Sequence, residues 1–380
     1  MRIGVDARIL SHKKCGISTY VHALVCHLLK LNNKLEIVLF SDSDIREEYV
    51  FPESNRLLRI ILTTQKGKKK QWLQKYLPQA LKKYNIDVYH ATWNTGIPFP
   101  KPCPCVLTIH DLAPWILGSH FKNLYKELRY KISHFLSAHA ADYIITDSFV
   151  SKTDIQQLCR INFKKIKVIY LGKEEHQYAI NEKESLDFLS KYGLISKNYL
   201  IDHAGIDHAR RNPLLALSVF EIVQRQDRDL FLVFTGNYYP ESIEYRKLKS
   251  EITKKALDAK VIITGWLSDE ELWILLSNAK VALIPSLYEG FCLPLLDAFS
   301  AGVPTLTTTC GSLPEIGKDA SVQVDPENKE KFVHFARRML NEQSFRELLV
   351  AKGKVRLLDY NWDDTAKKTL AVYCGCLGHN

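Results

Sequence analysis

The sequence predicts an α/β protein built from two doubly wound domains. Short apolar runs alternate along the chain with longer stretches whose apolar residues recur at helical spacing, which is typical of βαβ units and a parallel sheet. This alternation occurs before residue 173 and again after residue 197, and 380 residues are enough for two domains. We therefore expect two parallel sheets that face a central cleft, with ligands at the carboxyl ends of the strands.

The first domain is expected to span residues 1–175 and to begin with a buried strand at 3–5. A loop at Gly16 and an amphipathic helix over about 17–31 follow that strand. The later apolar runs predict strands at 37–40, 58–62, 88–90, 106–110 and 143–146 and a helix over 72–84.

The second domain, residues 198–359, repeats this order. Its strands are expected at 200–203, 230–235, 261–264, 281–285 and 304–307, and its helices at 212–224, 270–278 and 293–301. Between the domains, residues 176–197 are polar and charged and give no strand signal. We interpret them as a hinge region.

Composition excludes several classes of protein. Apolar residues make up 46% of the chain and charged residues 25%, which is the balance of a soluble globular protein, and no apolar run approaches the ~18 residues of a spanning helix. The N-terminus meets charge almost at once, so we expect no signal peptide. Nine cysteines without a disulfide-framework spacing indicate free thiols in a reducing cytoplasm. Only one residue separates the cysteines in each of the pairs Cys103/Cys105 and Cys374/Cys376, and this spacing fits a zinc site poorly.

Charge is distributed unevenly along the chain. The net charge is +10, and residues 1–200 carry 30 Lys and Arg against 18 Asp and Glu, whereas residues 201–380 carry 22 against 24. The excess positive charge therefore lies in the first half, which indicates an anionic partner there. Nucleic acid, an anionic membrane surface and a phosphorylated substrate all remain open on charge alone.

The segment from Ser286 to Asp297 is the strongest candidate site. It joins the apolar run 281–285 to an apolar helix, and a strand, a glycine-containing turn and a helix N-terminus form an anion site because free backbone N–H groups face the ligand. Glu289 lies in the turn and Asp297 about two helical turns further on, so both carboxylates can bind sugar hydroxyls beside a phosphate held by the amides of 291–293. The alternative is a helix whose first turn carries acids only for its dipole.

Two further polar groups follow predicted strands. Arg210 and Arg211 come after the strand at 200–203, where adjacent guanidinium groups suit bidentate contacts to a diphosphate. Taken alone, a solvated charge pair is the simpler explanation. His110 and Asp111 end the strand at 106–110 and suit acid–base chemistry or hydroxyl binding, or a structural hydrogen bond.

Residues 66–84 interleave basic and aromatic side chains, which suits an anionic bilayer surface. A solvated helix face or a nucleic-acid patch has the same composition, and of the three we favour membrane contact. The sequence holds no dinucleotide-binding, P-loop or nucleophile-elbow motif. Asp42-Ser43-Asp44 has an Asp-x-Asp form, but it lies in a polar turn where such residues cap helices, so no metal site is expected.

Together these stretches resemble the retaining glycosyltransferases of family 4, which have the GT-B fold of two Rossmann-like domains. The likeness covers most of the chain and is carried in the family's order by MRIGVDARIL…CGISTYVHAL, VLTIHDLAPW, ADYIITDSFVSKTDI, KVIYLG and GIDHARRNPLLAL. Its most specific part is TGWLSDEELWILLSNAKVALIPSLYEGFCLPLLDAFSAGVPTLTTTCGSLPEI, which is similar to the family's nucleotide-sugar motif. The combination of VDARIL, RRN and EGFCLP is most similar to bacterial mannosyltransferases of O-antigen and capsule assembly.

The resemblance implies a role for each candidate residue. Glu289 would contact hydroxyls of the donor sugar and Asp297 those of the ribose, Arg210 and Arg211 would hold the diphosphate, and His110 would lie near the transferred sugar. The further donor-binding residues that it implies are Gly16, Trp266, Leu267, Gly290, Phe291, Cys292 and Leu293. Residues 360–380 would pack back on the first domain.

Cys292 stands where the family often has glycine. If the backbone there has a positive φ, the cysteine is strained. If it does not, the thiol lies at a helix N-terminus, and we predict an acidic thiol that is labelled fastest and is protected by nucleotide.

The leading hypothesis is a metal-independent retaining transferase without a cofactor. It would move a hexose, with mannose from GDP-mannose as the candidate, to a lipid-linked or growing glycan acceptor in surface-polysaccharide synthesis. The basic first half agrees, because lipid-diphosphate carriers are anionic, and we expect a cytoplasmic protein, peripheral on the inner face of the membrane, with no nucleic-acid partner. The alternatives are a UDP-sugar transferase, a GT-B-like epimerase, or a non-catalytic nucleotide- or nucleic-acid-binding protein.

Overall fold

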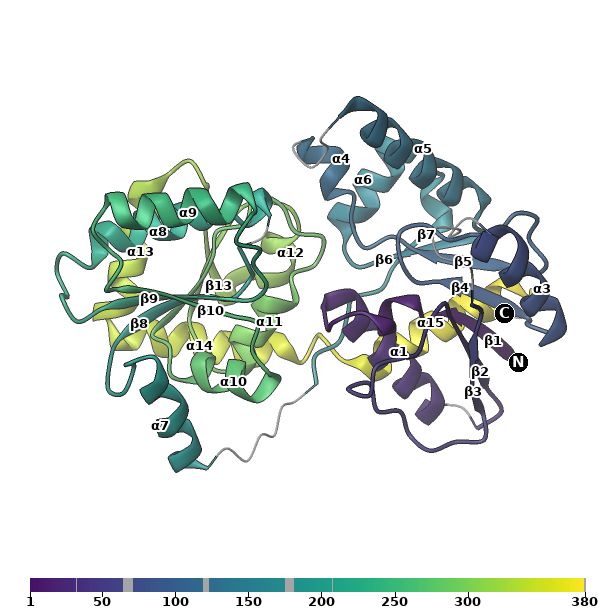
Figure 1. The fold of residues 1–380 in the computed structure, drawn as a ribbon, viewed down its shortest axis with the longest axis horizontal. Helices are drawn as coiled ribbons and strands as arrows, with labels where there is room; N and C mark the ends of the chain where they lie inside the picture. Colours follow the sequence, from purple (N-terminus) through teal and green to yellow (C-terminus); the bar gives the residue numbers. More distant parts are fainter. Residues whose placement is uncertain (32, 64–70, 119–122, 175–180, 207, 379–380) are drawn as a thin grey trace. The chain divides into compact units, whose positions relative to one another are not determined.

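The computed structural model describes residues 1–31, 33–63, 71–118, 123–174, 181–206 and 208–378. The chain divides into an N-terminal unit, Met1–Gly172 with Tyr360–Asn380, and a C-terminal unit, Lys173–Asp359. Each unit is a parallel sheet with helices on its faces (Figure 1).

The sheet of the N-terminal unit has the strand order β3-β2-β1-β4-β5-β6-β7, and all of its pairings are parallel. The strands are β1 (Arg2–Asp6), β2 (Glu36–Ser41), β3 (Leu57–Ile61), β4 (Val88–Ala91), β5 (Cys105–Thr108), β6 (Tyr143–Thr146) and β7 (Ile166–Val168). The central strands β4 and β5 are wholly buried, because helices cover a parallel sheet on both faces.

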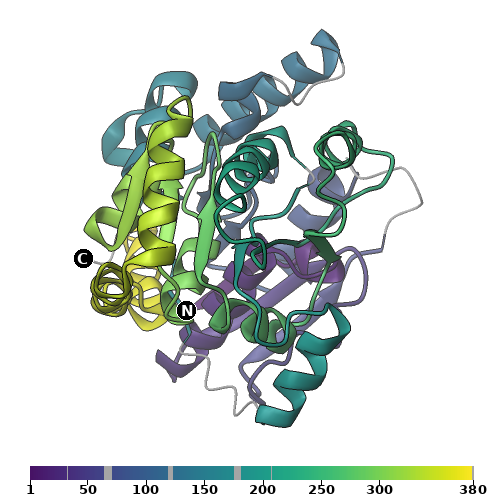
Figure 2. The ribbon, with the colours of Figure 1, turned by 90° about the vertical axis from the view of Figure 1, so that its left-hand side faces the viewer.

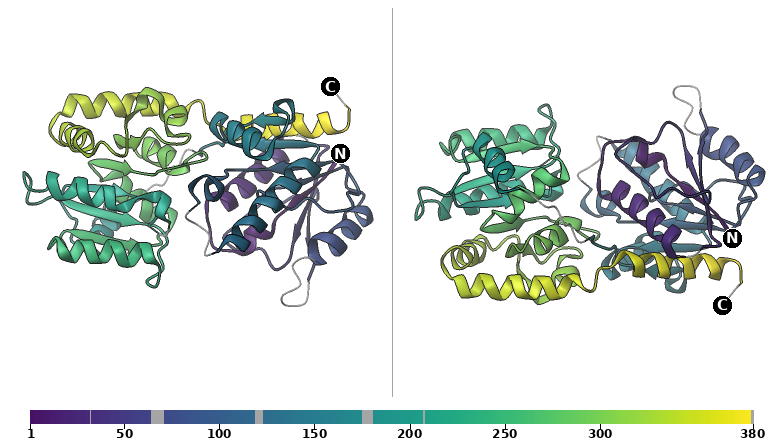
Figure 3. Two further views of the ribbon diagram at one scale, coloured as in Figure 1. Left: turned by 90° about the horizontal axis from the view of Figure 1, so that it is seen from above. Right: turned by 90° about the horizontal axis from the view of Figure 1, so that it is seen from below.

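The helices of this unit are α1 (Gly16–Leu31), α3 (Leu77–Lys83), α4 (Ala113–Leu117), α5 (Leu124–Ala140), α6 (Phe149–Cys159) and α15 (Trp362–Cys376). One apolar cluster joins α3, α5 and α6 to the sheet through Leu81, Ala138 and Ile155. The C-terminal helix α15 packs against α1, as Figure 3 shows. Its Tyr373 hydroxyl lies 2.7 Å from His90 Nδ1, which anchors the end of the chain in the core of this unit.

The C-terminal unit repeats the same strand permutation, β10-β9-β8-β11-β12-β13, with all pairings parallel. Its strands are β8 (Tyr199–Asp202), β9 (Phe231–Thr235), β10 (Val261–Gly265), β11 (Val281–Ile284), β12 (Thr305–Thr308) and β13 (Ser321–Val324). Its helices are α7 (Glu182–Lys191), α8 (Pro213–Val223), α9 (Ile243–Lys254), α10 (Asp269–Ser277), α11 (Leu293–Ser300), α12 (Leu313–Gly317), α13 (Lys329–Asn341) and α14 (Gln343–Leu357).

Helices lie on both faces of this second sheet (Figures 1 and 2). Neighbouring residues of β8 point to opposite faces of the sheet, because side chains alternate along a strand. Leu200 joins the cluster formed with α8, α9 and α13, and Ile201 joins the cluster formed with α7, α10 and α11.

The strands predicted at the centres of both sheets are confirmed, with differences at their ends. β5 ends at Thr108, so His110 lies in the loop beyond the strand rather than within it. The edge strands β7 and β13 and the helices α5, α9, α13 and α14 had no counterpart among the predicted elements. The segment 176–197, interpreted as a hinge, contains α7, whose Phe188 and Leu189 are buried in the C-terminal unit.

The interpretation of residues 66–84 as a membrane-facing basic helix is not supported by the part that the structure describes. Residues 64–70 lie outside the described residues. Trp72 is buried, its ring Nε1 donates to the Ser41 carbonyl at 3.4 Å, and the Arg8 guanidinium lies 4.1 Å from the ring centroid. The aromatic side chain expected to anchor a bilayer is therefore part of the core.

Candidate active site

Arg210, Arg211 and Glu289, three of the residues predicted to bind a donor, gather where the strand order of the C-terminal sheet reverses. β8 and β11 are neighbours at this point, and β8 ends at Asp202 while β11 ends at Ile284. Open α/β sheets bind ligands beyond the carboxyl ends of the strands at such a reversal. The loop after β8 supplies Arg210 and Arg211, and the loop after β11 supplies Glu289.

Glu289 is buried and holds both arginines. Arg210 Nη1 donates to Oε2 at 2.9 Å, Arg211 Nη1 donates to Oε1, and the Ser286 hydroxyl donates to Oε1 at 2.8 Å. A carboxylate offers about four acceptor positions. Three are used here, so the carboxylate can still accept one hydrogen bond from a ligand hydroxyl.

Glu289 is ionised in this arrangement. Burial by itself raises its pKa, but the two guanidinium groups and the Ser286 hydroxyl outweigh burial and lower the pKa below its ordinary value. Within these three side chains, two arginines against one carboxylate leave one positive charge unbalanced. That charge suits an anionic ligand such as a diphosphate.

The last residue of β12 and the loop after it support the turn that carries Glu289. Ser312 N donates to the Glu289 carbonyl at 2.9 Å, and the Thr308 hydroxyl donates to the Ser286 carbonyl at 2.5 Å. Gly311 has φ +58°, and a Cβ there would lie 2.6 Å from Glu289 N and O. Only glycine fits this approach of one backbone to another.

Cys292 precedes α11 with φ +82° and is 5% exposed, so the strained alternative holds. Burial raises the pKa of its thiol well above the ordinary value, and the nearby Glu289 carboxylate adds to the effect. The prediction of an acidic thiol is therefore wrong, whereas fast labelling and protection by nucleotide stay predictions.

Asp202 is a residue of this site that the sequence analysis missed. It ends β8, is fully buried, and accepts a hydrogen bond from Ala204 N at 3.2 Å. Burial raises its pKa to about 7, and the nearby Arg211 opposes this rise. A carboxylate that ends an otherwise apolar strand was a signal available in the sequence.

The other predicted donor-binding residues occupy several positions. Gly290 and Phe291 are buried in the turn before α11, and Leu293 begins that helix. Asp297 lies on α11, where Lys173 Nζ donates to it at 2.5 Å. Trp266 follows β10 with about half of its surface exposed.

Leu267 packs against the apolar cluster of α7, α10 and α11. Gly16 and His110 belong to the N-terminal unit, where Gly16 is exposed at the first residue of α1.

His110 is buried between two hydrogen-bond acceptors. Its Nδ1 lies 2.7 Å from Asp147 Oδ2, and its Nε2 lies 3.1 Å from the Thr92 carbonyl oxygen. A carbonyl oxygen only accepts, so Nε2 donates to Thr92, and Nδ1 donates to Asp147 when that carboxylate is ionised. Burial raises the pKa of Asp147, and the nearby His110 opposes this rise. Burial lowers the pKa of His110, but the Asp147 charge and these hydrogen bonds prevail and raise it.

A second buried histidine, His90, behaves in the opposite way. Its nitrogens contact the hydroxyls of Tyr373 and Thr108, each at 2.7 Å, and burial lowers its pKa to about 3. Hydroxyl partners can accept or donate, so they do not stabilise an imidazolium as the neighbours of His110 do.

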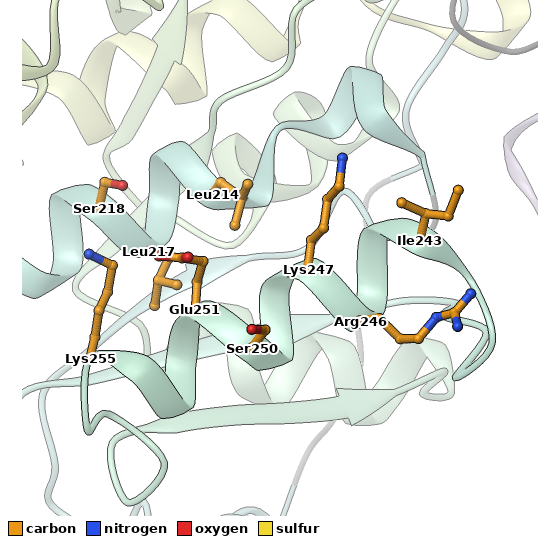
Figure 4. Close-up of a pocket in the computed structure, with 9 residues that line it drawn as sticks. All are labelled: Leu214, Leu217, Ser218, Ile243, Arg246, Lys247, Ser250, Glu251 and Lys255. Carbon is orange, nitrogen blue, oxygen red and sulfur yellow. The ribbon is translucent and has the colours of Figure 1, made fainter.

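A groove of about 630 Å³ between α8 and α9 is separate from this cluster (Figure 4). Two of its three basic side chains, those of Arg246 and Lys255, have protein partners. Lys255 Nζ donates to Glu221 at 2.6 Å, and Arg246 Nη2 donates to the Glu241 carbonyl at 2.7 Å. We assign no ligand to this groove.

Two parallel sheets that share one strand permutation, with an arginine pair and a carboxylate at the reversal of one of them, are the architecture and the site expected of a glycosyltransferase with the GT-B fold. Two family models agree: "Glycosyltransferase Family 4" matches residues 15–174, and "Glycosyl transferases group 1" matches residues 190–356. The chain is a glycosyltransferase with a family 4 domain in its N-terminal unit and a group 1 domain in its C-terminal unit.

The curated relatives include bacterial mannosyltransferases. The O-antigen chain mannosyltransferase B of Escherichia coli is 25% identical over 77% of this chain and 76% of its own length. An MMP α-(1→4)-mannosyltransferase of Mycolicibacterium hassiacum is 39% identical, over 39% of this chain and 36% of its own length.

Solved structures support the fold at low sequence identity. Sucrose-phosphate synthase from Thermosynechococcus elongatus has a TM-score of 0.78 at 16% identity, with all of both chains covered. Anabaena HepE in complex with UDP and glucose has a TM-score of 0.76 at 14% identity, with 98% of each chain covered. Among the helices that the structure describes, none combines the length and apolar character needed to cross a bilayer.

Proposed function

We propose that this glycosyltransferase is a retaining enzyme that moves a hexose from a nucleoside diphosphate sugar to a lipid-linked or growing glycan acceptor in surface-polysaccharide synthesis. The observation that carries the proposal is the binding of Arg210 and Arg211 to the buried Glu289 at the end of β11. This cluster combines cations for a diphosphate with an acceptor for a sugar hydroxyl.

In the proposed reaction the acceptor hydroxyl oxygen bonds to the anomeric carbon of the donor sugar while the bond from that carbon to the β-phosphate oxygen breaks. The departing phosphate oxygen takes the hydroxyl proton, on the same face of the sugar, so the configuration is retained. Arg210 and Arg211 stabilise the charge that develops on the phosphate. Two guanidinium groups supply the positive charge that a metal ion provides in other transferases, so we propose a metal-independent reaction without a cofactor.

Mannose from GDP-mannose is the donor that we propose, because the E. coli and M. hassiacum relatives are named as mannosyltransferases. A UDP-sugar is the second candidate, since a protein of the same fold, HepE, is described in complex with UDP. The cluster of Arg210, Arg211 and Glu289 suits the diphosphate of both donors. The two donors differ in their base.

A thermal-shift panel with GDP, UDP, ADP and dTDP tests the site and the donor class. A nucleotide at about 100 times its Kd adds about 2.7 kcal/mol to the free energy of unfolding. We expect a rise in Tm with one of the four, GDP first, that is lost in Arg211→Ala. Arg225→Ala is the matched control, because that arginine is two-thirds exposed and pairs with Glu221 on α8. No shift with any nucleotide, or equal shifts in both variants, would contradict the assignment.

The protonation of His110 predicts a pH dependence. We propose that the positive charge of the His110 imidazolium lies near the sugar being transferred and supports the reaction. Activity is then present below the raised pKa of His110 and falls as the pH rises through that pKa. Asp147→Asn removes the negative charge that raises the pKa of His110, and burial then lowers that pKa. We expect the alkaline limb of the profile of kcat/KM against pH to move to lower pH.

Asp142→Asn is the matched control for this profile. Asp142 is a carboxylate of the same unit that accepts from Lys101 Nζ at 2.8 Å and from Cys105 N at 2.7 Å. Its replacement is expected to leave the alkaline limb in place. If the limb is at the same pH in Asp147→Asn, the proposed role of the imidazolium is wrong.

A further inference from the structure

Helix α5 presents an apolar surface to solvent. Its apolar residues with more than a third of their surface exposed are Leu124, Tyr125, Leu128, Ile132, Phe135 and Leu136. Leu124 and Tyr125 are the most exposed, at 78% and 72%. Figure 1 shows α5 beside α6 in the N-terminal unit, and the two helices are in contact.

These six side chains form one stripe. Helical residues follow one another at about 100°, so the six lie within about 120° of the helix circumference, on a rod about 25 Å long. On the opposite side, His134 and Ala138 are buried against the unit. An ordinary surface helix turns its apolar stripe inward, as α13 does with Phe332 and Met339. The stripe on α5 is turned outward, which marks an interaction surface.

The charges around the stripe select its partner. Lys126 and Arg129 are exposed on α5, and the single acid of the helix, Glu127, accepts from Lys131 Nζ at 2.5 Å. The N-terminal unit as a whole carries 28 Lys and Arg against 15 Asp and Glu. A partner that is both apolar and anionic complements this surface, whereas a second copy of the same unit would bring like charges together.

We propose that the outer face of α5 lies in the headgroup region of an anionic lipid bilayer. The leucine, isoleucine and aromatic side chains enter the boundary between headgroups and acyl chains, and the helix lies in the plane of the membrane. Arg129, beside the edge of the stripe, and Lys126, further round the helix, reach the lipid phosphates with their long side chains. The contact does not depend on which donor the enzyme uses, and it places the enzyme on the surface where a lipid-linked acceptor is embedded.

Vesicle flotation of the full chain tests this proposal. The wild type is expected to float with vesicles of phosphatidylcholine and phosphatidylglycerol in equal parts, and less so as salt rises or with phosphatidylcholine alone. Leu128→Ser with Ile132→Ser is expected to lower the partition coefficient about tenfold or more, since two side chains no longer leave water. Lys126→Glu with Arg129→Glu is expected to remove the salt-dependent part of binding.

The matched control is Val355→Ser with Leu358→Ser, which replaces two exposed apolar residues in the C-terminal unit. This variant is expected to float like the wild type. Each variant is also measured for its nucleotide-induced rise in Tm. A retained rise shows that the variant is folded and that the donor site is intact, so failure of the membrane contact is distinguished from failure of the proposed function.

Two results would overturn the proposal. One is flotation that is absent in the wild type or unchanged in the Leu128/Ile132 variant. The other is a dimer in light scattering that the same variant converts to a monomer, since the stripe would then bind a second copy of the chain.

Discussion

Replacement of Glu289 by glutamine is expected to lower kcat/KM by about 10²-fold or more. Glutamine keeps the volume but removes the charge that holds Arg210 and Arg211, and its single carbonyl oxygen cannot serve both of them and Ser286. The donor sugar hydroxyl that we propose to bind here then loses its charged acceptor. Loss of one preorganised electrostatic contact at a reacting centre costs about 10²–10³-fold in rate.

Nucleotide binding separates this prediction from simple unfolding. In Glu289→Gln both arginines remain, and a negative charge next to the proposed diphosphate position is gone. We therefore expect the rise in Tm with the nucleoside diphosphate to persist while turnover falls. Steady-state kinetics with the donor identified by the thermal-shift panel, together with that shift, are the measurements.

Glu221→Gln provides the matched control for Glu289→Gln. Glu221 also has two cationic partners, Lys255 at 2.6 Å and Arg225 at 3.3 Å, but it lies at the groove between α8 and α9. Glu221 lies outside the cluster formed by Arg210, Arg211 and Glu289, so this variant is expected to retain full activity. Equal losses in the two variants, or full activity in Glu289→Gln, would contradict the role given to Glu289.

The parts of this site that are continuous in sequence were predictable from the sequence. Glu289 follows a buried strand in a turn before a helix, and the pair Arg210 and Arg211 follows another strand of the same sheet. Parallel strands end at one edge of their sheet, so residues just beyond two strand ends can meet there. The spacing of apolar runs was enough to place these strands.

The contacts that fix the geometry were not predictable, because they join residues far apart in the sequence. Lys173 pairs with Asp297 across 124 positions, and the backbone of Gly311 lies against that of Glu289. No local pattern marks either partner. Burial was equally hidden at Trp72, whose basic neighbours indicated a surface helix although its ring lies in the core.

Helix α5 was missed for a physical reason. Its apolar residues recur at helical spacing but face solvent, and charged residues interrupt them in the sequence. A pattern of this kind shows that a helix is amphipathic without showing which face is turned inward. The structure was needed to place Leu128 and Ile132 on the outside.

The second large effect is expected for Gly311→Ala. The added Cβ would lie 2.6 Å from Glu289 N and O, a separation that Cβ atoms essentially never show. The alanine backbone would also have to adopt φ +58°. Backbone cannot move aside as a flexible side chain does, so the turn that carries Glu289 is displaced. We expect a lower Tm and loss of the nucleotide-induced shift together.

Gly193→Ala separates the effect of the positive φ from the effect of the contact with the Glu289 backbone. Gly193 lies in the same unit with φ +66°, but nothing lies within 4 Å of an added Cβ. Its replacement therefore carries only the left-handed backbone cost of about 1–2 kcal/mol, a fall in Tm of about 2–8 °C, and leaves the nucleotide shift intact. If Gly311→Ala behaves no differently from Gly193→Ala, contact with the Glu289 backbone does not determine the geometry of the site. If only Gly311→Ala loses the shift, a glycine 22 positions from the carboxylate positions that carboxylate for the donor.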